Sequence, residues 1–140
     1  MALTLHHLER SRSHRILWLF EELGLDYEIE EYKRNPATFR ADPALRKIHP
    51  LGKAPIVTDG DRVVAETGRV IEYMLEAHGD GRLQPTAGSE AYHLYRYYLH
   101  YAEGSLMPPL LVRLIFDKML EAKLPFFIKP VVKGIVRKVS

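Results

Sequence analysis

The start of the chain shows a change of hydrophobic period that marks a strand followed by a helix. Residues 3–8, LTLHHL, alternate between two faces, so that His6 and His7 fall on opposite ones, and this predicts a strand. From residue 14 onward the apolar side chains recur at the spacing of one helical face. Ser13 is placed to cap this helix, and Gly24 is placed to end it.

The next segments alternate between strand and helix signals. Residues 26–32, DYEIEEY, predict a second strand, whereas residues 33–48 are polar, contain two prolines and predict a short or irregular helix. The runs APIVT and RVVAE flank an Asp-Gly pair, which is a strong hairpin signal. Residues 67–79, TGRVIEYMLEAHG, then have a helical period and close on Gly79.

This order of elements predicts an α/β domain. A strand, a helix and a strand in succession favour a parallel pair with a right-handed crossover, and the hairpin adds an antiparallel edge. A Gly- and Pro-rich linker at 81–88 separates this domain, residues 1–80, from a partial all-helical domain, residues 89–140.

The helical part is expected to hold two helices. The first runs from about residue 90 to 123, and Pro108 and Pro109 should bend or break it. The second begins at Pro125, in a tail from residue 123 to 140 that has five basic residues and no acidic one. Such a tail fits a domain helix or an amphipathic helix on a membrane surface, and the first is the simpler interpretation.

Composition indicates a folded protein of ordinary type. Of the 140 residues, 46% are hydrophobic and 27% are charged, which is enough to form a core. The chain has no apolar run long enough for a membrane helix and no secretory signal pattern, so no membrane span and a cytoplasmic location are expected. A net charge of +2 gives no argument for a nucleic-acid partner.

The chain has no cysteine. This excludes disulfides, thiolate metal sites and a thiol nucleophile carried by the protein. Any sulfur chemistry must therefore use the sulfur of a ligand. The histidines form no metal-binding pattern, so no metal is expected.

Four stretches of the sequence carry a resemblance to a known family. They are SRSHRILWLFEELGLDYE, HPLGKAPIVTDGD, VVAETGRVIEYML and YAEGSLMPPLL, in this order along the chain. Together they resemble a bacterial, serine-type glutathione transferase. The second and third stretches are the most specific, because Pro-Leu-Gly-Lys-x-Pro is followed about ten residues later by Glu-Thr.

The resemblance implies both a fold and an activity. The fold is a thioredoxin-like N-terminal domain of βαβαββα order with a cis bond at Pro55, followed by an all-α domain that is shorter here than family members usually have. The activity is that of a homodimeric glutathione transferase, which conjugates the thiolate of reduced glutathione to a hydrophobic electrophile. Glutathione-dependent reduction of peroxides or disulfides, and non-catalytic binding of glutathione or apolar ligands, are the alternatives.

Pro55 and its neighbours match the glutathione site of that family. On its own, Pro55 is a strand-starting residue, because proline cannot donate to a sheet ladder. The resemblance implies instead that a cis bond turns the main chain of Ala54 toward a tripeptide ligand. It also implies that Lys53, otherwise an ordinary surface lysine, faces the glycine carboxylate, and that His49 lies at the cleft rim.

Glu66 and Thr67 stand where a strand gives way to a helix. The free N–H groups and partial positive charge of a helix N-terminus attract a carboxylate. The resemblance implies that Thr67 holds the α-carboxylate of the γ-glutamyl group and that Glu66 lies near its amine. From the residues alone, Thr67 is a cap of its own helix.

Ser11 and Ser13 are the two candidates for stabilising the ligand's thiolate. A free thiol has a pKa near about 8.5, which a hydroxyl donor and a helix N-terminus can lower. Family members place a catalytic serine about four residues before a helix arginine; Arg15 then selects Ser11 and leaves Ser13 as the N-cap and the alternative. Arg12 is expected to help stabilise the anion.

A pocket for the electrophile is expected between the two domains. The resemblance implies that Tyr101 and Met107 line it. From the residues alone, core or dimer contacts account for most of the tyrosines between residues 92 and 101.

Overall fold

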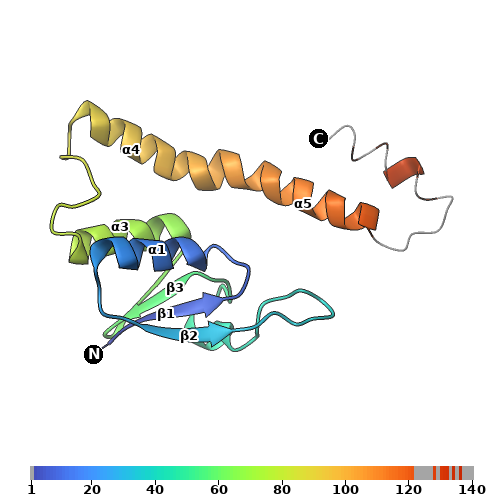
Figure 1. The fold of residues 1–140 in the computed structure, drawn as a ribbon, viewed down its shortest axis with the longest axis horizontal. Coiled ribbons are helices and arrows are strands. Elements are labelled where there is room, and N and C mark those ends of the chain that lie inside the picture. The colour runs from blue at the N-terminus through green and yellow to red at the C-terminus, as the bar shows by residue number, and fades with distance from the viewer. Residues whose placement is uncertain (1, 122–127, 129, 133, 135, 137–140) are drawn as a thin grey trace. The chain divides into compact units, whose positions relative to one another are not determined.

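The computed structural model describes residues 2–121, 128, 130–132, 134 and 136. The chain forms two compact units, Met1–Tyr95 and Arg96–Ser140. Up to Glu121, the helices and strands are β1 (Leu3–Leu8), α1 (Ser13–Leu23), β2 (Glu28–Tyr32), α2 (Leu45–Ile48), β3 (Ile56–Asp59), β4 (Arg62–Ala65), α3 (Thr67–His78), α4 (Glu90–Tyr101) and α5 (Met107–Glu121), and Figure 1 labels most of them; a π-helical segment, η1 (Ala102–Leu106), joins the last two.

Four strands form one mixed sheet in the order β2-β1-β3-β4. β1 and β2 are parallel, whereas β3 is antiparallel to both β1 and β4. The helix α1 makes the crossover of the parallel pair, and a turn at Gly60, with a φ of 59°, closes the hairpin. The predicted parallel pair, the predicted hairpin and the thioredoxin-like fold are therefore confirmed.

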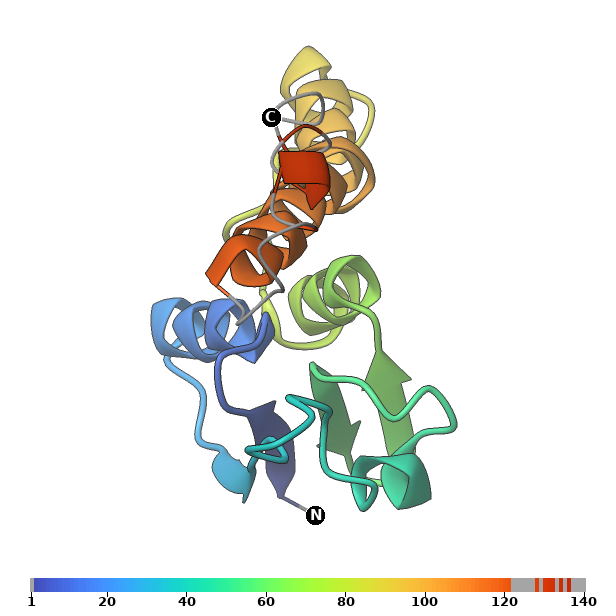
Figure 2. The same ribbon diagram turned by 90° about the vertical axis from the view of Figure 1, so that its right-hand side faces the viewer.

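Helices α1 and α3 cover one face of the sheet (Figures 1 and 2). Leu5 from the sheet, Ile16 and Phe20 from α1, and Val70 and Met74 from α3 are fully buried between them. Truncating a buried aromatic ring such as that of Phe20 costs about 3–5 kcal/mol. The periodic faces found in the sequence thus meet in a single core.

A smaller core lies on the opposite face of the sheet. Leu8, Tyr32, Leu45 and Ile56 form it, together with half-buried side chains from the segment 33–48. Within that segment α2 is only four residues long, in agreement with the predicted short helix.

His6 also lies on this second face and is part of its hydrogen-bonded packing. It is 4% exposed, and its Nε2 lies 2.8 Å from the hydroxyl of Thr58. Its Nδ1 lies 3.2 Å from a carboxylate oxygen of Glu30. Burial lowers the pKa of His6 below its ordinary value, although the charge and hydrogen bond of Glu30 oppose this shift.

The start of α1 differs from the prediction. Ser13 is the first residue of the helix and not its cap; Arg12 holds the cap position, with no side-chain capping hydrogen bond. The Ser13 hydroxyl contacts the side chains of Ser11 and His7, so it is not free to cap the helix. The predicted end is confirmed, because Gly24 has a left-handed φ of 63° at the C-cap.

Between Glu90 and Glu121, the helical segments α4, η1 and α5 follow one another without a loop. Pro108 and Pro109 lie in the first turn of α5, where a missing N–H group is tolerated. The change of geometry comes just before them, in η1, where the N–H of Met107 bonds the carbonyl of Ala102, five residues back. The predicted break at Pro108 and Pro109 is therefore wrong, and the helix changes its geometry in the segment just before them.

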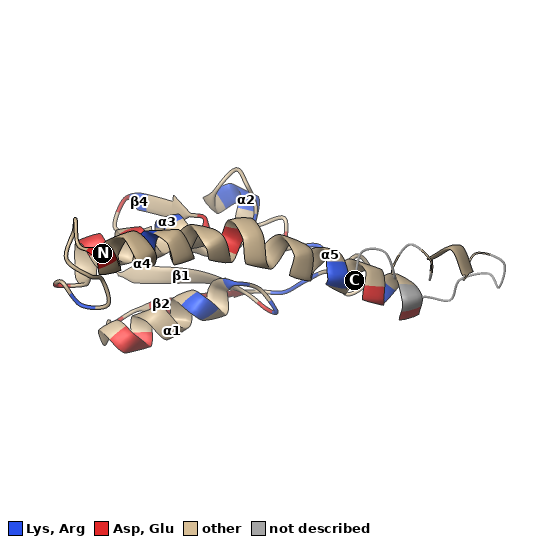
Figure 3. Ribbon diagram, turned by 90° about the horizontal axis from the view of Figure 1, so that it is seen from above, with Lys and Arg blue, Asp and Glu red and all other residues tan. Residues whose placement is uncertain are grey.

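The second predicted helix, from Pro125 onward, lies largely outside the described residues. Among those that are described, none of the helices combines the length and the apolarity that a bilayer crossing requires. Lys and Arg are interspersed with Asp and Glu along the described strands and helices (Figure 3).

Candidate functional site

Three segments meet at one end of the sheet. His6 on β1 pairs with Ile56 at the start of β3, and Ile56 pairs with Ala65 at the end of β4. The loop after β1, the residues before β3 and the residues after β4 adjoin this row. They contain most of the predicted glutathione-site residues, namely Ser11, Arg12, Lys53, Ala54, Pro55, Glu66 and Thr67.

The peptide bond between Ala54 and Pro55 is cis. Pro55 is buried, while Ala54 is half-buried and stands two residues before Ile56, the first residue of the β3 ladder. Main-chain groups beyond the end of a ladder can pair with an added extended peptide. Ala54 is therefore the point at which such a peptide can extend the sheet.

Glu66 has an unusual backbone conformation at the start of α3. Its φ of 73° and ψ of 128° are rare for a residue other than glycine, and it occupies the N-cap position. Conformations of this kind cost about 1–3 kcal/mol and cluster at ligand-binding sites. Thr67 follows as the first helical residue and is 3% exposed. Thr67 is thus not the cap of its own helix, and its N–H is one of the free donors of the helix end.

A tight turn leads into the cis bond. The carbonyl oxygen of His49 accepts a hydrogen bond from the N–H of Gly52 at 2.9 Å. The ring atom Nδ1 of His49 accepts one from the N–H of Leu51 at 3.3 Å. Gly52 has a φ of 58°, which glycine adopts without strain. Lys53 follows with an exposed side chain. His49 therefore shapes the turn that carries Lys53, and its place at a cleft rim stays a prediction.

The two candidate serines differ in exposure. Ser13 is completely buried; its Oγ lies 2.7 Å from Ser11 Oγ and 2.9 Å from His7 Nδ1, and it donates to the carbonyl oxygen of Leu8 at 3.3 Å. Ser11 is half-buried, and its Oγ accepts the N–H of Ser13 at 3.2 Å. Ser11 is therefore the hydroxyl that an external ligand can reach, and Ser13 lies behind it.

His7 connects these serines to the sheet, although the sequence suggested no role for it. Its ring packs edge-on against that of His14, with centroids 4.7 Å apart. Burial lowers the pKa of His7, the neighbouring His14 lowers it further, and the charge of Glu31 on β2 opposes both effects. A signal was present in the sequence, because strand alternation puts His7 on the face that carries Leu5, which α1 covers.

Arg34 holds the loop that contains Ser11. Its guanidinium donates to the carbonyl oxygens of Glu9 at 3.1 Å, Arg10 at 3.3 Å and Phe39 at 3.0 Å. Arg10 has a φ of 50°, so the loop takes a left-handed step directly before Ser11. Sequence reasoning missed Arg34, because its two partners in the loop, Glu9 and Arg10, lie 25 and 24 positions earlier and no local pattern joins them.

The other predicted residues are placed as follows. Arg12 is half-buried at the cap of α1. Tyr101 and Met107 belong to the second unit, where the ring of Tyr101 stacks on that of Tyr97 with centroids 5.9 Å apart and Met107 begins α5. The expected contribution of Tyr101 and Met107 to an electrophile pocket stays a prediction.

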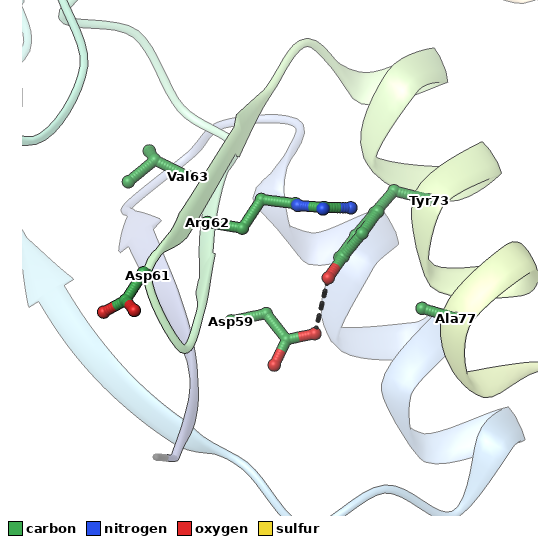
Figure 4. A pocket seen from close by; sticks show the side chains of 6 residues that line it. All are labelled: Asp59, Asp61, Arg62, Val63, Tyr73 and Ala77. Carbon is green, nitrogen blue, oxygen red and sulfur yellow. Dashed lines mark hydrogen bonds between the residues drawn. The ribbon is translucent and has the colours of Figure 1, made fainter.

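A pocket at the far end of the hairpin is separate from this site. Figure 4 shows its lining residues, Asp59, Asp61, Arg62, Val63, Tyr73 and Ala77. Asp59 is the last residue of β3, whereas Ala54 precedes the first. Hydrogen bonds from His78 and Tyr73, both 2.7 Å long, lower the pKa of Asp59. This group of side chains ties β3 to α3 and has no part in the arrangement around Ser11.

Comparison with known proteins defines the class of this chain. Residues 10–77 match the family model described as "Glutathione S-transferase, N-terminal domain". This stretch runs from the loop before α1 to the last turn of α3 and includes the serines, the cis bond and the Glu66–Thr67 pair. The fold and the match together define a thioredoxin-like protein of the glutathione S-transferase type.

Relatives extend the likeness along the whole chain. Glutathione S-transferase 1 of Saccharomyces cerevisiae is 38% identical over 141 residues, which cover 96% of this chain and 60% of the relative. A crystal structure of a glutathione S-transferase from Actinobacillus pleuropneumoniae aligns with a TM-score of 0.75 at 38% identity, over 98% of this chain and 62% of that one. The chain belongs to the glutathione S-transferase family, and it spans about 60% of the length of these relatives.

A more distant structure shares the fold. The glutathione transferase homolog from Lodderomyces elongisporus, solved with two GSH per subunit, aligns with a TM-score of 0.73 at 19% identity. The alignment covers 99% of this chain and 66% of that one.

Proposed function

We propose that this chain binds glutathione and transfers its thiolate to a hydrophobic electrophile. The observation that carries this proposal is the meeting, at one end of the sheet, of the Ala54 main chain, the N-terminus of α3 and the Ser11 hydroxyl. These groups suit different parts of one tripeptide. The names of the relatives support the same activity.

The binding step uses the main chain and a helix end. Ala54 pairs with the main chain of the ligand as an added strand. The N–H and hydroxyl of Thr67, at the positive end of α3, hold the α-carboxylate of the γ-glutamyl group, and Glu66 lies near its amine. Lys53 faces the glycine carboxylate as a point charge.

The chemical step depends on lowering the pKa of the ligand's thiol. Ser11 donates a hydrogen bond to the thiolate, and Arg12 and the N-terminus of α1 add positive potential. A reduction of two pKa units is worth about 2.7 kcal/mol and raises the thiolate fraction up to about a hundredfold. Proximity to the bound electrophile then supplies the remaining acceleration.

The decisive experiment combines binding and turnover. We expect the chain to be retained on immobilised glutathione and to conjugate glutathione to an aryl halide. Ser11→Ala should keep the retention and lose about 10- to 100-fold in turnover, since it removes only the thiolate donor. A larger loss in Ser13→Ala than in Ser11→Ala would contradict the assignment of Ser11.

Other outcomes separate the alternatives. Retention without any turnover would favour a binding module. Turnover of an organic hydroperoxide in place of the aryl halide would favour a glutathione-dependent reductase. Failure of the chain to bind glutathione would overturn both enzymatic functions and leave only a module that binds apolar ligands. The expected homodimer and cytoplasmic location stay predictions.

A further inference from the structure

Behind the proposed thiolate donor lies a short chain of polar side chains. Ser11 Oγ, Ser13 Oγ and His7 Nδ1 follow one another at 2.7 and 2.9 Å. Ser13, the middle member, is 0% exposed, so its hydroxyl has no access to bulk water. The hydrogen bonds of Ser13 must therefore be satisfied by the side chains and carbonyl around it.

The direction of these hydrogen bonds depends on what Ser11 does. A hydroxyl has one proton to donate. When Ser11 donates to a thiolate, it has no proton left for Ser13, and the 2.7 Å contact between them requires that Ser13 donate to Ser11. The buried Ser13 oxygen then needs a donor of its own.

His7 is the partner of Ser13 that can supply this donor. The carbonyl oxygen of Leu8 can only accept, so it cannot replace a donor to Ser13 Oγ. The Nδ1 of His7 donates when it carries the ring proton. With the proton there, every bond points the same way, from His7 to Ser13 to Ser11, and such aligned chains polarise one another.

We propose that His7 is a positioning residue for the thiolate: its Nδ1–H donates to the Ser13 hydroxyl, which donates to Ser11, so that the Ser11 proton is directed at the ligand's sulfur. This inference rests on the proposed function, because it takes Ser11 as the group next to the sulfur. The inference adds two residues to the proposed site, the buried Ser13 and His7 on β1, which act through Ser11 without touching the ligand.

The surroundings of His7 agree with a neutral ring that carries one proton. The charged and titratable groups that act on it are His14 from α1 and Glu31 from β2. Burial and His14 lower its pKa, so the ring is neutral near neutral pH and its single proton is available for Nδ1. In the unliganded or thiol form, Leu8 accepts from Ser13, and Ser11 can donate to Ser13 in turn.

The test compares His7→Leu with His7→Asn. Both side chains are close in size, but only asparagine can donate a hydrogen bond from the place of Nδ1. The pKa of the bound glutathione thiol is measured by the ultraviolet absorbance of the thiolate. Affinity for S-methylglutathione, which has no ionisable thiol, is measured alongside.

We expect His7→Leu to raise the pKa of the bound thiol by about half to one unit; starting from about 6.5, this lowers the thiolate fraction at pH 7 by about 1.5- to threefold. Turnover should fall in proportion, while the affinity for S-methylglutathione and the KM for glutathione stay unchanged. His7→Asn should keep the pKa of the bound thiol close to its wild-type value. Ser13→Ala should behave as His7→Leu does, and it covers the case in which His7→Leu does not fold.

His6→Asn is the matched control on the same strand. His6 faces the other side of the sheet, so this variant should leave the pKa of the bound thiol unchanged. If Ser11→Ala raises that pKa but His7→Leu and Ser13→Ala do not, the role of His7 is overturned and the proposed function survives. If Ser11→Ala has no effect on that pKa, or wild type does not bind glutathione, the proposed function fails first.

Discussion

The carboxylate of Asp59, at the end of β3, lies 2.7 Å from Nε2 of His78, in the last turn of α3. The same carboxylate oxygen accepts the hydroxyl of Tyr73 at 2.7 Å (Figure 4). β3 and α3, which are separated in the sequence by β4, are thus joined at the end of the domain that lies away from the proposed glutathione site. The joint stabilises the position of α3, whose opposite end carries Thr67.

Loss of this joint should reduce stability in a pH-dependent way. The pKa of Asp59 is lower in the folded chain than in the unfolded one, so its stabilising effect is present above about pH 4 and is lost as pH falls through the folded-state value. We expect Asp59→Asn to lower the free energy of unfolding, measured with urea, by about 1–2 kcal/mol at pH 7. The free energy of unfolding of this variant should also depend less on pH in the acid range. Asp61→Asn, an exposed carboxylate on the same turn, is the control. Equal effects of the two substitutions would contradict this account.

His6 should make the fold sensitive to mild acid. Its pKa is lowered in the folded state, so between that value and about 6.5 the unfolded chain binds a proton that the folded chain does not. The contribution of His6 to the free energy of unfolding is therefore constant above about pH 6.5. Below that pH it falls, by at most about 1.4 kcal/mol per pH unit for one proton.

Glu30→Gln tests this explanation of acid sensitivity. The substitution removes the charge that partly restores the pKa of His6 but keeps an oxygen to accept the hydroxyl of Tyr32. We expect the free energy of unfolding to fall more steeply between pH 6.5 and 5 than it does in wild type. Urea unfolding at several pH values measures this. A shallower loss would show that another group dominates in this range.

The backbone of Glu66 should limit stability at the proposed ligand site. Glycine adopts its φ of 73° without the steric cost that a side chain brings, so Glu66→Gly should raise the free energy of unfolding by about 1 kcal/mol. Glu66→Ala keeps the strain and loses the same carboxylate, and its stability should stay near wild type. Both variants should weaken glutathione binding equally if the carboxylate lies near the γ-glutamyl amine. A glycine variant less stable than the alanine variant would contradict the presence of strain.

Much of the fold could be predicted because its signals are local. The alternation in residues 3–8, the Asp-Gly pair of the hairpin and the glycine after α1 each depend on neighbours in the sequence. The cis bond, the family and the thioredoxin-like order came from the resemblance, since composition and period do not distinguish one α/β fold from another. Those predictions agree with the structure.

The features that were missed depend on contacts between distant residues. Ser13 was expected to cap a helix, because a serine before an apolar run usually does, but its hydroxyl bonds His7 from the neighbouring strand. Arg34 reaches across to the carbonyl groups of Glu9 and Arg10, which no periodicity can reveal. The strained φ of Glu66 likewise follows from the junction of β4 and α3 and not from the residue itself.

The π-helical segment changes the phase of the helix that follows it. A wider turn accommodates one residue more than an α-turn, and one residue corresponds to about 100° of rotation around the helix axis. Side chains of α5 therefore point about a quarter-turn away from where the pattern of Tyr97 and Tyr101 would place them in an unbroken α-helix. Removing one residue between Ala102 and Leu106 would rotate α5 as a whole about its axis. The length of this short segment therefore determines which residues of α5 lie on each of its sides.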